Sequence, residues 1–243
     1  MSDQSVSIIV PAYNEEGNIE AALASVLNAV SGRVEDYEII VIDDGSLDQT
    51  AALVQKEAGK NPRIKVFSNA VNRGYGYSFR RGVSLAGKEY VTVFPGDNDM
   101  SADSLGDLIN ARTKAEVIIT YSTTPHRRSL FRRLLSMAFV VMMNFLFGLK
   151  LKYYNGAFIC KTQLLRSVAI QSEGLAVLAE GIVRLIKSGY TYQAIAFEHT
   201  GRKCDKSKAL TLKSFLAVLN TILILIRDIY FHPEYKKKVS CSI

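Results

Sequence analysis

Two carboxylates follow an apolar run in the stretch YVTVFPGDNDM, residues 90–100. The run before Pro95 is typical of a buried strand, and Pro95 and Gly96 predict a turn that ends it. Asp97 and Asp99 stand two positions apart, and this spacing on an extended segment places both side chains on one side. Their oxygens could hold a hard divalent cation. A helix cap or a proline-led turn with solvated acids would have the same sequence.

Three other predicted strands end in polar or glycine-rich segments. They are PAYNE at 11–15, DDGS at 43–46 and NRGYG at 72–76. Ligands of parallel sheets bind at the carboxyl ends of the strands, which lie along one edge. The two acid pairs, at 43–44 and 97–99, therefore predict a shared site, although a strand-to-helix cap explains either pair alone.

Strand-like and helical periodicity alternate through this half of the chain. The predicted strands are 5–10, 37–42, 63–69 and 90–94, and the predicted helices between them are 16–30, 47–59 and 74–87. Such alternation implies a mainly parallel sheet with helices on both faces, so the expected fold class is α/β.

Composition limits the classes of protein further. The chain has 243 residues, 48% of them hydrophobic and 22% charged, which fits a globular domain. Cys160, Cys204 and Cys241 lie far apart and without metal-ligand spacing. They predict no disulfide framework and favour a reducing compartment. The first residues lack the layout of a signal peptide, and PAYNEEGN after the first strand is not a dinucleotide-binding G-x-G-x-x-G.

The ordered set of motifs resembles family 2 glycosyltransferases, which have the Rossmann-like GT-A fold. The matching segments are SIIVPAYNE, IIVIDDGSLDQT, NRGYGYSFRRG and PGDND. Later, YYNGAFICKTQLL and GRKCDKSKAL resemble dolichol-phosphate mannosyltransferase-like enzymes, a group of polyprenyl-phosphate glycosyltransferases. We expect a GT-A catalytic domain over 1–212 that includes an apolar helix at 134–149, and a C-terminal apolar helix with a basic tail over 213–243.

The resemblance implies a UDP- or GDP-sugar donor and inversion at the sugar carbon. The family's metal motif usually has the form D-x-D-x-Q, whereas the aligned residues here run from Pro95 to Asp99. The expected catalytic residues and ligands of a Mg²⁺ or Mn²⁺ ion are therefore Asp97 and Asp99. Gly96, which has no side chain, would let the backbone approach the diphosphate.

The resemblance also places nucleotide-sugar contacts on the strand tips. Main chain around Pro11 and Ala12 can edge the base, and Tyr13 can pack on a ring. Asp43 can accept an N–H of uracil or guanine. Gly96 and four further residues complete the expected set: Glu15, Asp44, Arg73 and Gly74.

The acceptor determines which side chains are needed. A lipid phosphate is ionised near pH 7 and needs cations, whereas a hydroxyl acceptor needs a general base. Arg and Lys side chains suit phosphate, although Asp205 replaces the glycine of the family's R-x-x-G-x-S-K motif. The expected acceptor-phosphate residues are Arg132, Arg133, Arg202, Ser207 and Lys208.

Two further residues have alternative interpretations. Glu180 is the best base candidate for a hydroxyl acceptor, but a glutamate on a helix surface is the more ordinary interpretation. His199 could be an extra metal ligand, and a partly buried strand histidine is again the more ordinary interpretation.

Two apolar segments adjoin basic residues. Residues 134–149 follow RRSLFRR at 127–133, and residues 214–226 precede Arg227. Both segments are shorter than the roughly 20 residues of a spanning helix. Their basic flanks favour peripheral or monotopic attachment at the cytoplasmic face of a membrane. Core helices or homo-oligomer contacts are the alternatives, and no nucleic acid partner is expected because the basic clusters lack interleaved aromatic residues.

The expected function is metal-dependent, inverting transfer of a sugar from a nucleotide-sugar to a polyprenyl phosphate, such as dolichyl or undecaprenyl phosphate. One alternative is the same fold acting on a glycan hydroxyl. The other is a nucleotide-sugar-binding protein without catalysis, because Pro95 stands where the family has an acid.

Overall fold

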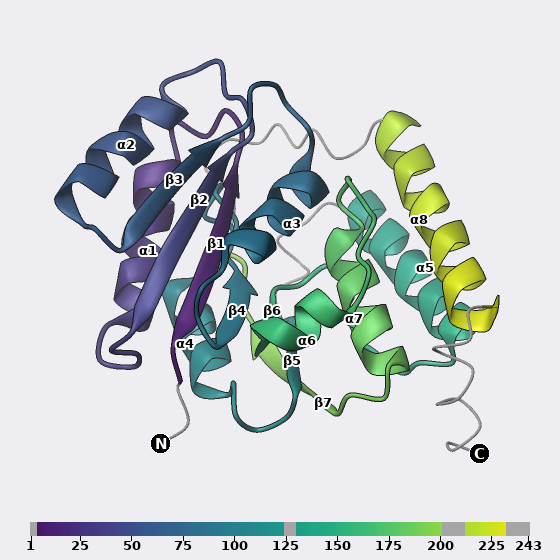
Figure 1. Cartoon of the computed structure of the whole chain (residues 1–243). Coiled ribbons are helices and arrows are strands. Elements are labelled where there is room, and N and C mark those ends of the chain that lie inside the picture. The colour runs from purple at the N-terminus through teal and green to yellow at the C-terminus, as the bar shows by residue number, and fades with distance from the viewer. Residues whose placement is uncertain (1–3, 124–129, 201–211, 232–243) are drawn as a thin grey trace.

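The computed structural model (Figure 1) describes residues 4–123, 130–200 and 212–231. Its strands are β1 Val6–Ala12, β2 Tyr37–Asp43, β3 Ile64–Ser68, β4 Tyr90–Val93, β5 Val117–Ser122, β6 Phe158–Lys161 and β7 Tyr192–Phe197. Its helices are α1 Ile19–Val30, α2 Thr50–Lys60, α3 Tyr75–Leu85, α4 Ala102–Asn110, α5 Leu130–Phe147, α6 Thr162–Ser167, α7 Val177–Lys187 and α8 Leu212–Phe231.

In the described part of the chain, the strands form one sheet with the order β3-β2-β1-β4-β6-β5-β7. Strand β6 is antiparallel to its neighbours β4 and β5, and all the other pairs are parallel. The predicted α/β class with a mainly parallel sheet is therefore confirmed.

Helices cover both faces of the sheet (Figure 1). Helices α1, α2 and α4 lie on one face, and α3, α6 and α7 lie on the other. Helices α5 and α8 lie side by side beyond α7 (Figure 1), and the hydroxyl of Tyr230 on α8 donates to the carbonyl of Leu146 on α5. Helices α5 and α8 thus form an outer layer on one side of the domain.

The central strands and the apolar side of α1 form the core on one face of the sheet. Every residue of β1 is buried, and the apolar positions Ile19, Leu23, Val26 and Val30 of α1 are buried against the sheet. Helical spacing predicted a helix within residues 16–30, and these buried residues recur every three or four positions because they lie on one face of it.

Strand β1 continues through Pro11, where the sequence predicted its end. The carbonyl of Ile9 accepts a hydrogen bond from the N–H of Phe94, which follows β4. The backbone groups of Pro11, two residues further along the strand, point to the same side as those of Ile9. The register with β4 ends at the pair Ile9 and Val93. The N–H that proline lacks would therefore lie beyond this register, so β1 can extend on its pairing with β2 alone.

Glu38, at the start of β2, ties three segments together at the amino end of the sheet. It accepts hydrogen bonds from the Ser7 hydroxyl at 2.7 Å, from Lys65 at 2.6 Å and from the N–H of Gly87. Burial raises the pKa of Glu38, but these hydrogen bonds outweigh burial and leave the pKa below its ordinary value. This anchor lies at the opposite end of β2 from Asp43.

The expected division of the chain at residue 212 stays a prediction. Helix α8 begins at Leu212 and is linked to α7 through an ion pair between Asp228 and Arg184, with 2.9 Å between Oδ2 and Nη2.

Candidate functional site

The carboxyl ends of β1, β2 and β3 lie level at one edge of the sheet. The register pairs Ala12 with Asp43, and Asp43 with Ser68. The segment after β4 lies over the same edge, because a Cβ on Gly96 would be 2.7 Å from the carbonyl oxygen of Pro11. Three of the predicted polar tips therefore meet here.

The loops after β1 and β2 are joined by hydrogen bonds. The N–H of Asn14 donates to the Ser46 hydroxyl at 3.0 Å, and the N–H of Glu15 donates to the Thr50 hydroxyl at 2.8 Å. Asn14 has a φ of 54°, a left-handed conformation that asparagine adopts more readily than most residues. This loop pair holds the half-buried Tyr13 and Glu15 at the site edge.

Asp44 brings in the fourth tip, the segment before α3. Its Oδ1 accepts from the Asn69 amide at 2.6 Å and from the N–H of Arg73 at 3.0 Å. Its Oδ2 accepts from the N–H of Gly74 at 2.8 Å. A buried carboxylate with three donors fixes this loop. The nucleotide contact predicted for Asp44 stays a prediction, and the structure adds a structural role.

The side chain of the neighbouring Asp43 accepts fewer hydrogen bonds within the described residues than that of Asp44. Its Oδ1 accepts from the N–H of Ser46 at 3.1 Å. It ends β2 beside Ala12, a residue whose main chain is expected at the base from the resemblance to family 2 glycosyltransferases. Asp43 is therefore the better candidate of the two acids for reading a base N–H.

Arg73 lies two residues before α3, with its guanidinium carbon 4.1 Å from the centre of the Tyr77 ring. The side chain is exposed. Stacking of this kind holds the guanidinium plane and leaves N–H groups for a ligand, so its predicted nucleotide contact fits its position and stays a prediction.

The acids after β4 lie on a turn. The N–H of Asn98 donates to the Pro95 carbonyl at 3.1 Å, and the N–H of Asp99 donates to Oδ1 of Asp97 at 3.2 Å. Both acids are half-buried. Tyr75, at the start of α3, lies close enough that burial and the Asp97 carboxylate together raise its pKa.

His199 joins this turn from a distant part of the chain. It follows β7 and is buried, and its Nδ1 lies 3.0 Å from Oδ2 of Asp99. The imidazole also makes an edge contact with Phe197, with 4.6 Å between ring centres. The histidine is thus buried, as the ordinary interpretation expected, but it stands beyond the strand and contacts a predicted metal ligand.

The donor atoms at this turn fit a hard divalent cation. Asp97 and Asp99 offer carboxylates and His199 an imidazole, and both ligand types bind Mn²⁺. Oδ1 of Asn98 is buried, and no partner for it lies within hydrogen-bonding reach in the described residues. Within those same residues, however, no group of three or more His, Cys, Asp and Glu side chains is clustered as a metal site.

The predicted acceptor residues are mostly outside the described ranges. Arg202, Ser207 and Lys208 lie there, as does the side chain of Arg132. Arg133 is exposed on α5. The predicted acceptor-phosphate site therefore stays a prediction.

The ordinary interpretation of Glu180 expected a position on the surface of a helix, and this expectation is wrong. It is fully buried, and its oxygens accept from the N–H groups of Gln171 at 3.0 Å and Ser172 at 2.7 Å. Arg184 pairs with it at 2.8 Å. These partners occupy the carboxylate, which argues against its use as a general base.

Comparison with known proteins identifies the family that has this arrangement. Residues 7–173 match the family model described as glycosyl transferase family 2. The chain belongs to this family. The structure resembles glucosyl-3-phosphoglycerate synthase from Mycobacterium tuberculosis, crystallised with Mn²⁺, UDP and glucosyl-3-phosphoglycerate, with a TM-score of 0.66 and 20% identity over 91% of this chain and 80% of that one. This likeness confirms the predicted GT-A fold of the family 2 chain.

Two curated relatives are similar over part of their length. A cholesterol galactosyltransferase of Borreliella burgdorferi is 37% identical over 111 residues, 46% of this chain and 30% of the relative. An undecaprenyl-phosphate 4-deoxy-4-formamido-L-arabinose transferase of Edwardsiella ictaluri is 26% identical over 132 residues, 54% of this chain and 40% of the relative. The matched segments thus cover less than half of each relative.

Proposed function

We propose that this family 2 chain transfers a sugar from a nucleotide-sugar to a polyprenyl phosphate at a membrane surface. The observation that carries the proposal is the acid turn of Asp97 and Asp99, which lies at the sheet edge where Asp43 ends β2. The undecaprenyl-phosphate transferase among the relatives supports the acceptor class.

The residues divide into two groups along the sheet edge. Asp43, with the backbone of Pro11 and Ala12, lies where a base would be read. Asp97 and Asp99, with His199 beside Asp99, would hold a Mg²⁺ or Mn²⁺ ion. When bound, the ion would neutralise the charge that the leaving diphosphate gains. The structural neighbour was crystallised with Mn²⁺ and UDP, which supports a divalent cation and a nucleotide donor for this chain.

In the transfer step, an oxygen of the acceptor phosphate forms a bond to the anomeric carbon of the sugar. The bond from that carbon to the donor diphosphate breaks, and its electron pair leaves with the nucleoside diphosphate. Attack from the opposite face inverts the configuration. The attacking oxygen is already ionised, so no general base is required, which agrees with the occupied carboxylate of Glu180.

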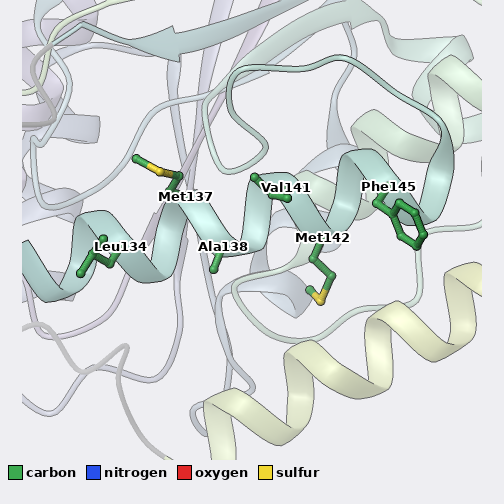
Figure 2. Close-up of a pocket in the computed structure, with 6 residues that line it drawn as sticks. All are labelled: Leu134, Met137, Ala138, Val141, Met142 and Phe145. Atoms are coloured by element: carbon green, nitrogen blue, oxygen red, sulfur yellow. The ribbon is translucent and has the colours of Figure 1, made fainter.

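The outer helices offer a surface for the membrane. A shallow hollow on α5 is lined by six side chains, Leu134, Met137, Ala138, Val141, Met142 and Phe145 (Figure 2). Phe145 is 87% exposed, and the neighbouring α8 also exposes Phe215 and Leu223. Contiguous exposed apolar residues on neighbouring helices are typical of an interaction surface.

Basic residues accompany this apolar face. Arg133 on α5 and Arg227 on α8 are both exposed. Apolar side chains with basic flanks match the interface of an anionic leaflet. Within the described residues, Ser214–Phe231 is also the one helix with the length and hydropathy to cross a bilayer. Its ion pair between Asp228 and Arg184 favours a helix that lies on the protein instead.

Incubation with polyprenyl phosphate and a panel of UDP- and GDP-sugars, with and without Mn²⁺, tests the reaction. We expect a sugar-phosphate lipid, identified by mass. The variant Asp97→Ala should lose the product, whereas the control Asp103→Ala, an exposed acid of α4 outside the turn, should keep it. Donor binding without any transfer by the parent protein, to lipid or to water, would indicate a binding protein instead.

A second candidate is transfer to a hydroxyl. It is favoured by the similarity to a cholesterol galactosyltransferase, because the acceptor group of cholesterol is a hydroxyl. Including cholesterol and a glycan in the same incubations separates the two candidates by the mass of the product.

Vesicle binding tests the membrane surface. The protein should bind anionic vesicles. It should bind them less in high salt, because added salt shortens the Debye length and screens the attraction between the basic residues and the lipid. Phe145→Glu should weaken binding, whereas Leu47→Glu, an equally exposed apolar position away from α5, should not. Equal binding to neutral and anionic vesicles at all salt concentrations would contradict the electrostatic part, and unchanged binding of Phe145→Glu would contradict insertion of α5.

A further inference from the structure

Helix α3 begins against a loop from the other half of the chain, residues 170–174. The N–H of Gly76 donates to the Glu173 carbonyl at 2.9 Å. A Cβ on Gly76 would lie 2.5 Å from the carbonyl oxygen of Ser172, so only glycine allows this approach. Arg80 adds an ion pair to Glu173 at 3.6 Å. The loop is thus the support on which the start of α3 rests.

Glu180 holds this loop in place. It accepts from the backbone N–H groups of Gln171 and Ser172 at 3.0 Å and 2.7 Å, and from Nε of Arg184 at 2.8 Å. Glu180 is 0% exposed and Arg184 is 1% exposed. A buried ion pair of this kind needs all its partners, since removal of one leaves a charge uncompensated.

Helix α8 completes the network from the outer layer. Oδ2 of Asp228 accepts from Arg184 at 2.9 Å and from the side-chain amide of Gln171 at 3.2 Å. The hydroxyl of Thr221 lies 3.1 Å from that of Ser172, within hydrogen-bonding distance. Thr221 and Asp228 are seven residues apart and therefore share one face of α8.

The other end of this chain of contacts is the candidate site. The N–H groups that precede α3, from Arg73 and Gly74, are held by Asp44 at the carboxyl edge of the sheet. The charge of the Asp97 carboxylate is felt at Tyr75, the first residue of α3. A displacement of loop 170–174 would therefore move the start of α3 relative to the acid turn.

We propose that Thr221 and Asp228 of α8 are positioning residues for the donor-binding edge, and that they act through Glu180 and loop 170–174. The packing of α8 against α7 then determines how firmly the start of α3 is fixed, and through it the affinity for a nucleotide. The inference rests on the proposed function only in naming the ligand as a nucleotide.

Hydrogen exchange of the protein without nucleotide tests the coupling directly. In Thr221→Val and Asp228→Asn, the amides of residues 72–80 and 170–174 should exchange about tenfold faster, because local opening becomes easier. Residues 44–50, which are tied to the loop after β1, should not change. Thr221→Ser, which keeps the hydroxyl, should restore the parent rates.

Tyr230→Phe is the matched control. It also removes a hydrogen bond of α8, but one that reaches α5 and not loop 170–174. Exchange at residues 72–80 should stay at the parent rate in this variant. Faster exchange confined to 170–174 in Thr221→Val and Asp228→Asn would overturn the inference, as would equal acceleration at 72–80 in Tyr230→Phe.

Affinity for UDP and GDP in the presence of Mn²⁺ gives the second readout. Thr221→Val and Asp228→Asn should bind several-fold more weakly, and Tyr230→Phe should bind as the parent does. Parent-like affinity in both α8 variants would overturn the link to the donor edge. A parent protein that binds neither nucleotide would contradict the proposed donor class, while the exchange rates would still decide whether α8 positions α3.

Discussion

We predict that Gly96→Ala lowers both the stability of the fold and the rate of transfer. The added methyl group would lie 2.7 Å from the carbonyl oxygen of Pro11 and 3.2 Å from Cβ of Ala12. The first distance is far below a van der Waals contact, and its partner is backbone of the buried strand β1. The turn that bears Asp97 and Asp99 must therefore move away from the sheet edge.

The size of the effect follows from overpacking. Inserting a methylene-sized group into a packed region costs roughly 1–3 kcal/mol. In a protein of this length, each kcal/mol lowers Tm by about 2–4 °C. A misplacement of about 1 Å can reduce a rate by about 100-fold. We expect the turn to move by less than this in Gly96→Ala, and the rate of transfer to fall about tenfold.

Thermal unfolding, calorimetry with UDP or GDP and Mn²⁺, and the transfer assay measure the three consequences. Gly59→Ala is the matched control, because a Cβ at this position of α2 meets nothing within 4 Å. Alanine within a helix is favoured over glycine by roughly 0.5–1 kcal/mol, so this variant should unfold at the same or a higher temperature and keep full activity.

Two results would refute the reasoning. Gly96→Ala with parent Tm and parent activity would show that the turn does not rest on the end of β1. A lowered Tm with unchanged nucleotide affinity and transfer would show that the position of the turn does not govern the site.

Three further predictions concern other parts of the chain. Asp97→Ala should abolish Mn²⁺-dependent nucleotide binding and transfer, and Asp99→Asn should be milder because an amide oxygen is still a weak ligand; activity within a few-fold of the parent in Asp97→Ala would contradict the metal role. Glu38→Gln should destabilise the fold by about 1–3 kcal/mol at pH 7 without changing nucleotide affinity, and a shift in nucleotide affinity would contradict the separation of this anchor from the site. The pKa of Glu38 is lowered on folding. The ionised carboxylate therefore contributes to the free energy of unfolding above the unfolded pKa, and this contribution is lost as the pH falls through the folded pKa. The acid-induced drop in Tm below about pH 4.3 should therefore be smaller in Glu38→Gln. Arg202→Ala should slow transfer to lipid phosphate by about ten- to a hundredfold with donor affinity kept, and Arg202→Lys should recover part of the rate; loss of donor affinity in step with activity would contradict the acceptor role.

The arrangement of the candidate site at the strand ends could be predicted from the sequence because its parts are local. A buried strand followed by a turn and two acids is visible within eleven residues, 90–100. Parallel strands place their carboxyl ends at one edge, so the tips that contain Asp43 and Asp97 could be expected to meet without knowledge of any long-range contact.

The long-range partners could not be predicted in this way. His199 meets Asp99 across one hundred positions of the chain, and local periodicity does not show which distant segments pack together. Glu180 has the sequence surroundings of an amphipathic helix, and burial among Gln171, Ser172 and Arg184 depends on the loop that folds over it.

The sequence by itself thus determined the alternation of strands and helices, the acids at the strand tips and the apolar character of the last helices, since each depends on residue type and near-neighbour spacing. Only the tertiary structure decided what those features contact. It assigned Asp44 to the loop before α3, placed residues 170–174 against Gly76 and left one face of α5 exposed beside α8. Hydrogen bonds and burial between distant segments depend on how the sheet and its layers pack, and that arrangement exists only in the folded chain.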